Sequence, residues 1–90
     1  MSETLKVHEV LIHALISEKA VNMIEAENKL CFIVNQKAGK KDVKNAIESI
    51  YKVKVDKVNV LRDLKGRKKA IVKLNKAFKA SDVAIKLGVL

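Results

Sequence analysis

The sequence feature that most restricts the fold is an uninterrupted run of five apolar residues at positions 30–34 (LCFIV). The run is far shorter than the roughly 20 residues that cross a bilayer, so it does not predict a membrane-spanning helix. Its length, its phenylalanine and its β-branched side chains are typical of a β-strand. Because no position in the run is polar, we expect a strand whose two faces are both covered by other parts of the chain.

Three other segments show strand patterns. Alternation and β-branched residues predict strands at residues 8–16, 52–61 and 69–74, and the strand that holds the apolar run extends over residues 29–35. Within residues 52–61 the apolar period slips by one near Asp56, which predicts a β-bulge. The 69–74 strand has one mainly apolar face and one face with two lysines.

Helix signals lie between and after these strands, at residues 17–26, 43–51 and 82–87. Ser17 and Ser81 are predicted N-caps, whereas Asn28 and Gly88 are predicted to end the first and last helices. The order β-α-β-α-β-β-α predicts an α+β domain built on a four-stranded sheet. We expect residues 1–90 to form one domain, with a flexible N-terminal segment at residues 1–8.

The distribution of charge is the main functional clue. The chain has 19 basic and 10 acidic residues, a net charge of +9; residues 1–45 carry a net +1, and residues 46–90 carry +8. Residues 52–79 hold eleven basic residues against only Asp56 and Asp63. Solubility alone does not require such a bias, so we expect a polyanionic partner.

The types of basic and aromatic residues narrow the partner to folded RNA. Lysines outnumber arginines 17 to 2, and lysine binds phosphate as a point charge rather than reading base edges. Three aromatic residues are too few for a stacked single-strand platform, so we expect recognition of RNA backbone and shape. The candidate RNA-binding residues are Lys37, Lys40, Lys41, Lys44, Lys54, Lys57, Arg62, Lys65, Arg67, Lys68, Lys69 and Lys73.

Catalytic and metal-binding patterns are scarce. His8 and His13 are five positions apart on a predicted strand, so they are expected to face opposite sides. Cys31 lies in the most apolar strand and is expected to be a buried, inert thiol. We therefore expect no enzyme activity, no metal and no cofactor. The single cysteine and the absence of a secretory signal favour a reducing compartment, and we expect a cytoplasmic protein.

A set of ordered motifs gives a family resemblance. The motifs are LISEKA (15–20), NKL (28–30), FIV (32–34), A-x-K with VK-x-AIE (38–48), Y-x-VKV-x-KVN (51–59) and GRKKA-x-VKL (66–74). Each motif is weak alone, but their order and spacing are specific. From about Val10 to Gly88 the chain resembles large-subunit ribosomal proteins of the L23 family.

The resemblance implies a four-stranded antiparallel sheet with helices. It implies a structural role in the ribosome, with binding to the third domain of large-subunit ribosomal RNA beside the polypeptide exit tunnel. It also implies contact with neighbouring ribosomal proteins and docking of the signal recognition particle, nascent-chain chaperones and the protein-conducting channel. Glu18 matches an acidic residue that bacterial relatives use to dock a chaperone, so it is a candidate factor-docking residue.

Two departures from the family pattern stand out. Many relatives have a basic or small residue followed by proline where this chain has His13 and Ala14. Bacterial relatives have a long hairpin that reaches into the tunnel, whereas residues 61–69 leave a short tip, as in archaeal members.

Two other classes of function remain. A free-standing basic nucleic-acid-binding protein, such as a DNA architectural protein, is expected to dimerise or to insert apolar wedges, and no wedge signal is evident. A small α+β enzyme resembling acylphosphatase would need an arginine fixed in a tight anion loop, and neither Arg62 nor Arg67 has such a loop around it.

Overall fold

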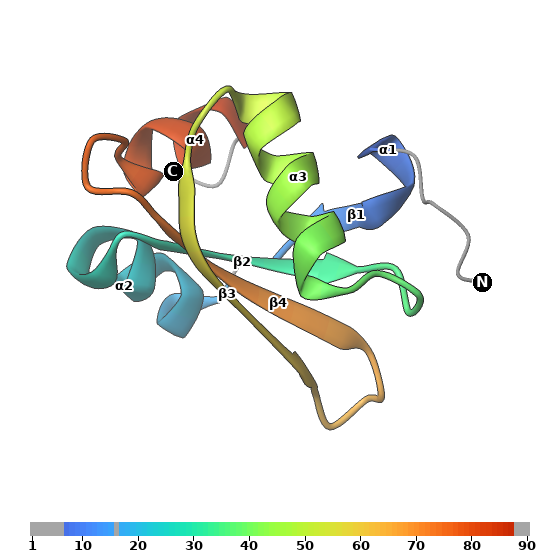
Figure 1. Cartoon of the computed structure of the whole chain (residues 1–90). Helices are drawn as coiled ribbons and strands as arrows, with labels where there is room; N and C mark the ends of the chain where they lie inside the picture. The colour runs from blue at the N-terminus through green and yellow to red at the C-terminus, as the bar shows by residue number, and fades with distance from the viewer. Residues whose placement is uncertain (1–6, 16, 88–90) are drawn as a thin grey trace.

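A four-stranded antiparallel sheet forms the centre of the molecule (Figure 1). The computed structural model describes residues 7–15 and 17–87. The strands are β1 (Leu11–Ala14), β2 (Lys29–Val34), β3 (Val55–Arg62) and β4 (Lys68–Leu74), in the spatial order β1-β2-β4-β3. The helices are α1 (Val7–Val10), α2 (Glu18–Glu27), α3 (Lys40–Tyr51) and α4 (Ala80–Leu87). The α+β class and the predicted order of elements are confirmed, with the four-residue α1 as an additional turn before β1.

The first strand is shorter than predicted. Residues 8–10, predicted as strand, belong to α1, so His8 does not share a strand with His13. A helical turn there buries Val10 in the main core, while its carbonyl accepts a hydrogen bond from the Asn35 N–H at 2.8 Å. Ile16, predicted to end this strand, lies outside the described residues, as do Gly88 and positions 1–6 of the expected N-terminal segment.

The apolar run of β2 is covered on both faces, as predicted. On one face Leu30, Phe32 and Val34 join the main core beneath α3 and α4. On the other face Cys31 packs with Ala20 and Met23 of α2. Figure 1 shows α3 and α4 on one side of the sheet and α2 on the other. Because α2 is a single short helix, part of its side of the sheet remains exposed.

The predicted bulge is present in β3, which begins three residues later than expected. Its register with β4 shifts between Val55 and Lys57, so that Val55 and Val58 both face the main core. The late start has a backbone cause: Lys52 adopts a left-handed conformation (φ 57°) and ends α3, with its N–H donating to the Glu48 carbonyl. The bulge also puts Lys57 on the same side of the sheet as α2.

Asn28 connects the end of α2 to the start of α4. It ends α2 in the left-handed conformation (φ 57°), as predicted. Its side-chain nitrogen donates to the carbonyls of Leu74 (3.3 Å) and Phe78 (2.9 Å), and its side-chain oxygen accepts from the Ala80 N–H (2.6 Å). Helix α4 therefore begins at Ala80, and the prediction that Ser81 caps a helix starting at Asp82 is wrong. The cap comes from a residue 52 positions away.

We predict that Asn28→Gly lowers the free energy of unfolding by about 2–4 kcal/mol, because three part-buried hydrogen bonds lose their partner while glycine still accepts the positive φ. Guanidinium unfolding measures the change. Lys52→Gly is the matched control at the other left-handed helix end, and it should leave stability unchanged or raise it by up to about 1 kcal/mol. Equal stability of Asn28→Gly and the parent protein would contradict this role.

Candidate nucleic-acid interface

Five lysines converge on the exposed part of the sheet, on the side of α2. We call them the sheet-face cluster: Lys19, Lys29, Lys57, Lys69 and Lys73. The strand pairing aligns three of them, because Lys73 lies opposite Lys29 on β2 and opposite Lys57 on β3. Side chains of directly paired residues share one face, so these three form a row across three strands.

Like charges in directly opposed positions destabilise a sheet. Lys57 and Lys73 are both exposed, and Glu27 is the one acidic partner of the row among the described residues, 3.2 Å from Lys29. Lys73 thus lies between two positively charged residues, Lys29 and Lys57, and the single carboxylate, that of Glu27, pairs with Lys29. A bound polyanion would remove this repulsion, because phosphate oxygens accept hydrogen bonds from several ammonium groups.

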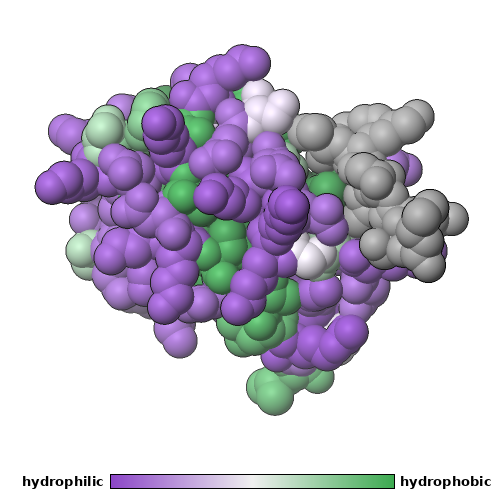
Figure 2. Space-filling view, viewed as in Figure 1, coloured by the Kyte–Doolittle hydropathy of each residue, from purple (hydrophilic) through white to green (hydrophobic). Residues whose placement is uncertain are grey.

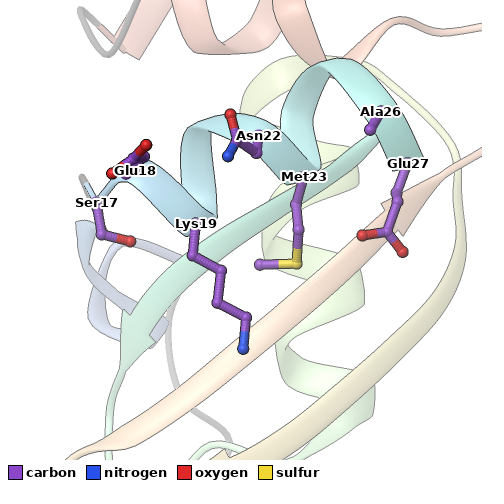
Figure 3. Close-up of a pocket in the computed structure, with 7 residues that line it drawn as sticks. All are labelled: Ser17, Glu18, Lys19, Asn22, Met23, Ala26 and Glu27. Carbon is purple, nitrogen blue, oxygen red and sulfur yellow. The ribbon is translucent and has the colours of Figure 1, made fainter.

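The environment of Cys31 shows that three lysines of the cluster lie close to one buried group. Burial raises the pKa of the Cys31 thiol, and the charges of Lys69, Lys19 and Lys29 act against that rise. The thiol therefore stays protonated, as expected for an inert core cysteine. Figure 3 shows Lys19 extending from α2 toward the sheet, on the same side of the helix as Met23.

A second group of cations lies at the tip of the β3–β4 hairpin. We call Arg62, Lys65, Arg67 and Lys68 the hairpin-tip cluster. Asp63 organises the tip by accepting hydrogen bonds from the backbone N–H groups of Lys65 and Arg67 (both 2.9 Å) and from the Arg67 side chain at 2.8 Å. Gly66 completes the turn at φ 80°, a backbone conformation that favours glycine.

Desolvation alone would raise the pKa of the Asp63 carboxyl. The hydrogen bonds from Arg67 and Lys65, together with the Arg67 charge, outweigh it, so the pKa lies below its ordinary value of 3.8. The carboxylate is therefore charged at neutral pH and holds Arg67 in place. Arg67 is thus occupied within the tip, whereas Lys65 remains exposed.

The hairpin tip is joined to a third group of cations at the start of α3. Lys37, Lys40, Lys41 and Lys44 form this helix-start cluster, and all four are exposed. Gln36, next to Lys37, accepts a hydrogen bond from Arg62 and donates to the Gly66 carbonyl at 3.2 Å. These contacts bring the hairpin-tip and helix-start clusters to the same end of the molecule.

The start of α3 does not present an empty anion site. The Asp42 carboxylate accepts a hydrogen bond from the Gly39 N–H at 3.0 Å, so an acid already occupies the first turn. Asp42 therefore caps its own helix; among the described residues it forms no ion pair. Phosphate recognition there would depend on the lysine side chains.

The predicted RNA-binding residues therefore fall into three clusters, with Lys54 exposed apart from them. The sheet-face cluster includes Lys19 and Lys29, which the sequence analysis did not select. Strand alternation places Lys29 on the Cys31 face, but its position beside Lys73 depends on a register that composition does not reveal. Glu18 lies on α2 along an open groove of about 600 Å³, and Figure 3 shows its side chain pointing away from Lys19.

An exposed apolar side chain lies beside these cations, and the sequence showed no signal for it. Leu64 is fully exposed in the β3–β4 loop. Figure 2 shows a largely hydrophilic face whose lowest point, where this loop lies in Figure 1, is apolar. The tip thus combines cations with a projecting leucine.

Within residues 7–15 and 17–87, no group of three or more His, Cys, Asp or Glu residues is placed to hold a metal ion. No helix in the same part of the chain is long and apolar enough to span a membrane.

We predict that Lys73→Gln raises the free energy of unfolding of the isolated protein by about 0.5 kcal/mol at low salt, because it removes two like-charge pairs. The gain should disappear near 1 M salt, where the Debye length is about 3 Å. Urea unfolding at two salt concentrations measures it. Lys76→Gln, in the loop after β4, is the matched control and should show no gain. An equal loss of stability at both salts would show that the row carries no repulsion.

We predict that the hairpin tip opens in acid. Because the folded pKa of Asp63 is depressed, its contribution is present above the unfolded pKa and is lost as the pH falls through the lower folded value. Amide signals of Lys65 and Arg67, followed by NMR during acid titration, should change below pH 3.8. Asp63→Asn should abolish that step. Titration of these signals at the ordinary value would contradict the role of Asp63.

The chain matches the model of a known protein family. The family model described as ribosomal protein L23 matches residues 9–80, which covers α2, α3 and all four strands of the sheet.

Proposed function

The chain belongs to the ribosomal protein L23 family, structural proteins of the large ribosomal subunit and not enzymes, and we propose that it binds the third domain of the large-subunit ribosomal RNA beside the polypeptide exit tunnel. The family implies the ribosome as its location and ribosomal RNA and other ribosomal proteins as its partners. We propose further that the ribosome is cytoplasmic and that the three lysine and arginine clusters are the RNA-binding surfaces.

The observation that carries the proposal is the row Lys29, Lys73 and Lys57. Three neighbouring strands place these positive charges in register, and their repulsion lowers the stability of the domain. A domain without an anionic partner would gain nothing from this arrangement. Lysine rows suit the phosphates of folded RNA, and the exposed strand surface offers a broad contact. The hairpin-tip and helix-start clusters extend the contact toward the other end of the sheet.

Factor docking is proposed for the outer side of α2. Glu18 is exposed and points away from the sheet-face cluster, so RNA on the sheet would leave this side accessible (Figure 3). Nascent-chain chaperones, the signal recognition particle and the protein-conducting channel are the proposed partners there. The short hairpin, with only residues 63–67 between β3 and β4, would leave the lining of the tunnel to other components.

A free-standing nucleic-acid-binding protein is the second candidate, favoured by the exposed Leu64 at the basic tip. Such a protein would bind duplex DNA and unrelated RNA as tightly as the ribosomal domain. The relative affinities for the ribosomal RNA domain, unrelated RNA and duplex DNA separate the two functions.

We predict that the protein prefers a transcript of the third large-subunit RNA domain over unrelated RNA and duplex DNA by at least about a hundredfold, or roughly 2.7 kcal/mol. Replacing Lys29, Lys57 and Lys73 by Gln should reduce the slope of log affinity against log salt by about 2–3, because three phosphate contacts are lost. Filter binding over a salt series measures both.

Glu18→Ala is the control for this experiment, because it alters charge on the outer side of α2. It should leave the preference for the RNA domain intact and weaken factor docking only. Equal affinity of the parent protein for all three polyanions would favour the free-standing alternative. An unchanged salt slope in the triple variant would exclude the lysine row as the contact.

A further inference from the structure

A cleft at the junction of α3 and α4 has features that phosphate binding alone does not explain. It encloses about 410 Å³ and lies on the side of the sheet that carries α3 and α4 (Figure 1). Its apolar wall includes Tyr51, Val53 and Phe78, all half-buried. Two of the three aromatic residues of the chain therefore meet in one cleft. Its volume is within the roughly 300–1,000 Å³ typical of small-molecule sites.

The aromatic wall is held rigidly. The Tyr51 ring stacks on the buried Phe32 ring, with centroids 6.5 Å apart. The Phe78 carbonyl accepts a hydrogen bond from Asn28, which fixes the backbone on the opposite side. Burial raises the pKa of the Tyr51 hydroxyl, so it stays a neutral donor. A preformed aromatic surface of this kind binds a planar ring with little loss of conformational entropy.

The rim of the cleft is positive. Lys52, Lys79 and Lys86 line it against a single acid, Asp82, and all four are exposed. An apolar aromatic wall inside a cationic rim matches a nucleotide, with a base that stacks and phosphates that meet ammonium groups. A hydrophobic peptide would satisfy the wall but would leave the lysines without partners.

We propose that this cleft, the junction cleft, receives one unstacked nucleotide of the bound RNA, with its base against Tyr51 and Phe78 and its flanking phosphates on Lys52, Lys79 and Lys86. The inference rests on the proposed RNA-binding function. The cleft and the lysine row lie on opposite faces of the sheet but at the same end of it, where β4 ends at Leu74 and the chain leads to α4. A folded RNA domain can contact both, because its unpaired bases project from its helices.

The single tyrosine makes the test direct, because the chain has no tryptophan and its fluorescence reports Tyr51 alone. The probe is a single-stranded oligoadenylate too short to fold, compared with a paired RNA duplex of equal length. We expect the single strand to quench the tyrosine signal with saturation and the duplex to leave it unchanged. Phe78→Ala should weaken this binding about tenfold, the scale of one lost base stack.

Ile85→Ala is the matched control, since Ile85 is an exposed apolar residue of α4 that does not line the cleft, and it should have no effect. A Lys79→Gln, Lys86→Gln double variant tests the rim without touching the apolar wall and should also weaken quenching. Circular dichroism confirms that each variant folds.

The result that overturns the junction cleft alone is normal binding of the ribosomal RNA domain with no tyrosine quenching and no effect of Phe78→Ala. Quenching by inorganic polyphosphate as strong as by oligoadenylate would show that the lysines bind phosphate and that no base stacks in the cleft. Quenching by an acidic aromatic peptide but not by RNA would assign it to a protein partner. Failure of the RNA domain itself to bind would instead overturn the proposed function.

Discussion

The carboxamide of Asn28 is the contact on which the arrangement of the sheet and α4 depends. Besides its three side-chain hydrogen bonds, its backbone carbonyl accepts from the Leu74 N–H at 3.1 Å. At a net contribution of about 0.5–1.5 kcal/mol each, these bonds are a large part of the stability of a small domain. They also hold the first residue of β2 beside the end of β4, which sets Lys29 opposite Lys73. One residue thus links the packing of α4 to the geometry of the charged face.

The charged face and the core place opposite demands on the same strands. Residues of β4 alternate between buried positions such as Ala70 and Val72 and the lysines at 69 and 73. The apolar side packs under α3 and α4, while the lysine side has Glu27 as its one acidic partner among the described residues and gains further partners from RNA in the proposed function. The outer side of α2, with Glu18, carries a different charge and is free for a second partner. Both proposed surfaces therefore lie on the α2 side of the sheet, with the RNA surface on the strands and the factor surface on the outer side of α2.

The fold could largely be predicted from local patterns, since the two-sided apolar run, the bulge near Asp56 and the ends of α2 depend on neighbouring residues. The start of α4 could not, because its cap is the remote Asn28 rather than Ser81. The first strand was predicted too long because Val10 joins the core from a helical turn rather than from a strand. For the site, charge counting found the right residue types. The lysine row, which adds Lys29, depends on strand register. The junction cleft depends on tertiary contact, because Tyr51 and Phe78 are far apart in the sequence.

The central claim is that the lysine row faces RNA, and acetylation footprinting of individual lysines tests it most directly. Reactivity at each lysine is compared by mass spectrometry between the free protein and the protein within the assembled large subunit. The account predicts that Lys29, Lys57 and Lys73 react with the acetylating reagent in the free protein and become strongly protected in the assembled subunit. Unchanged reactivity of all three in the assembled subunit would contradict it.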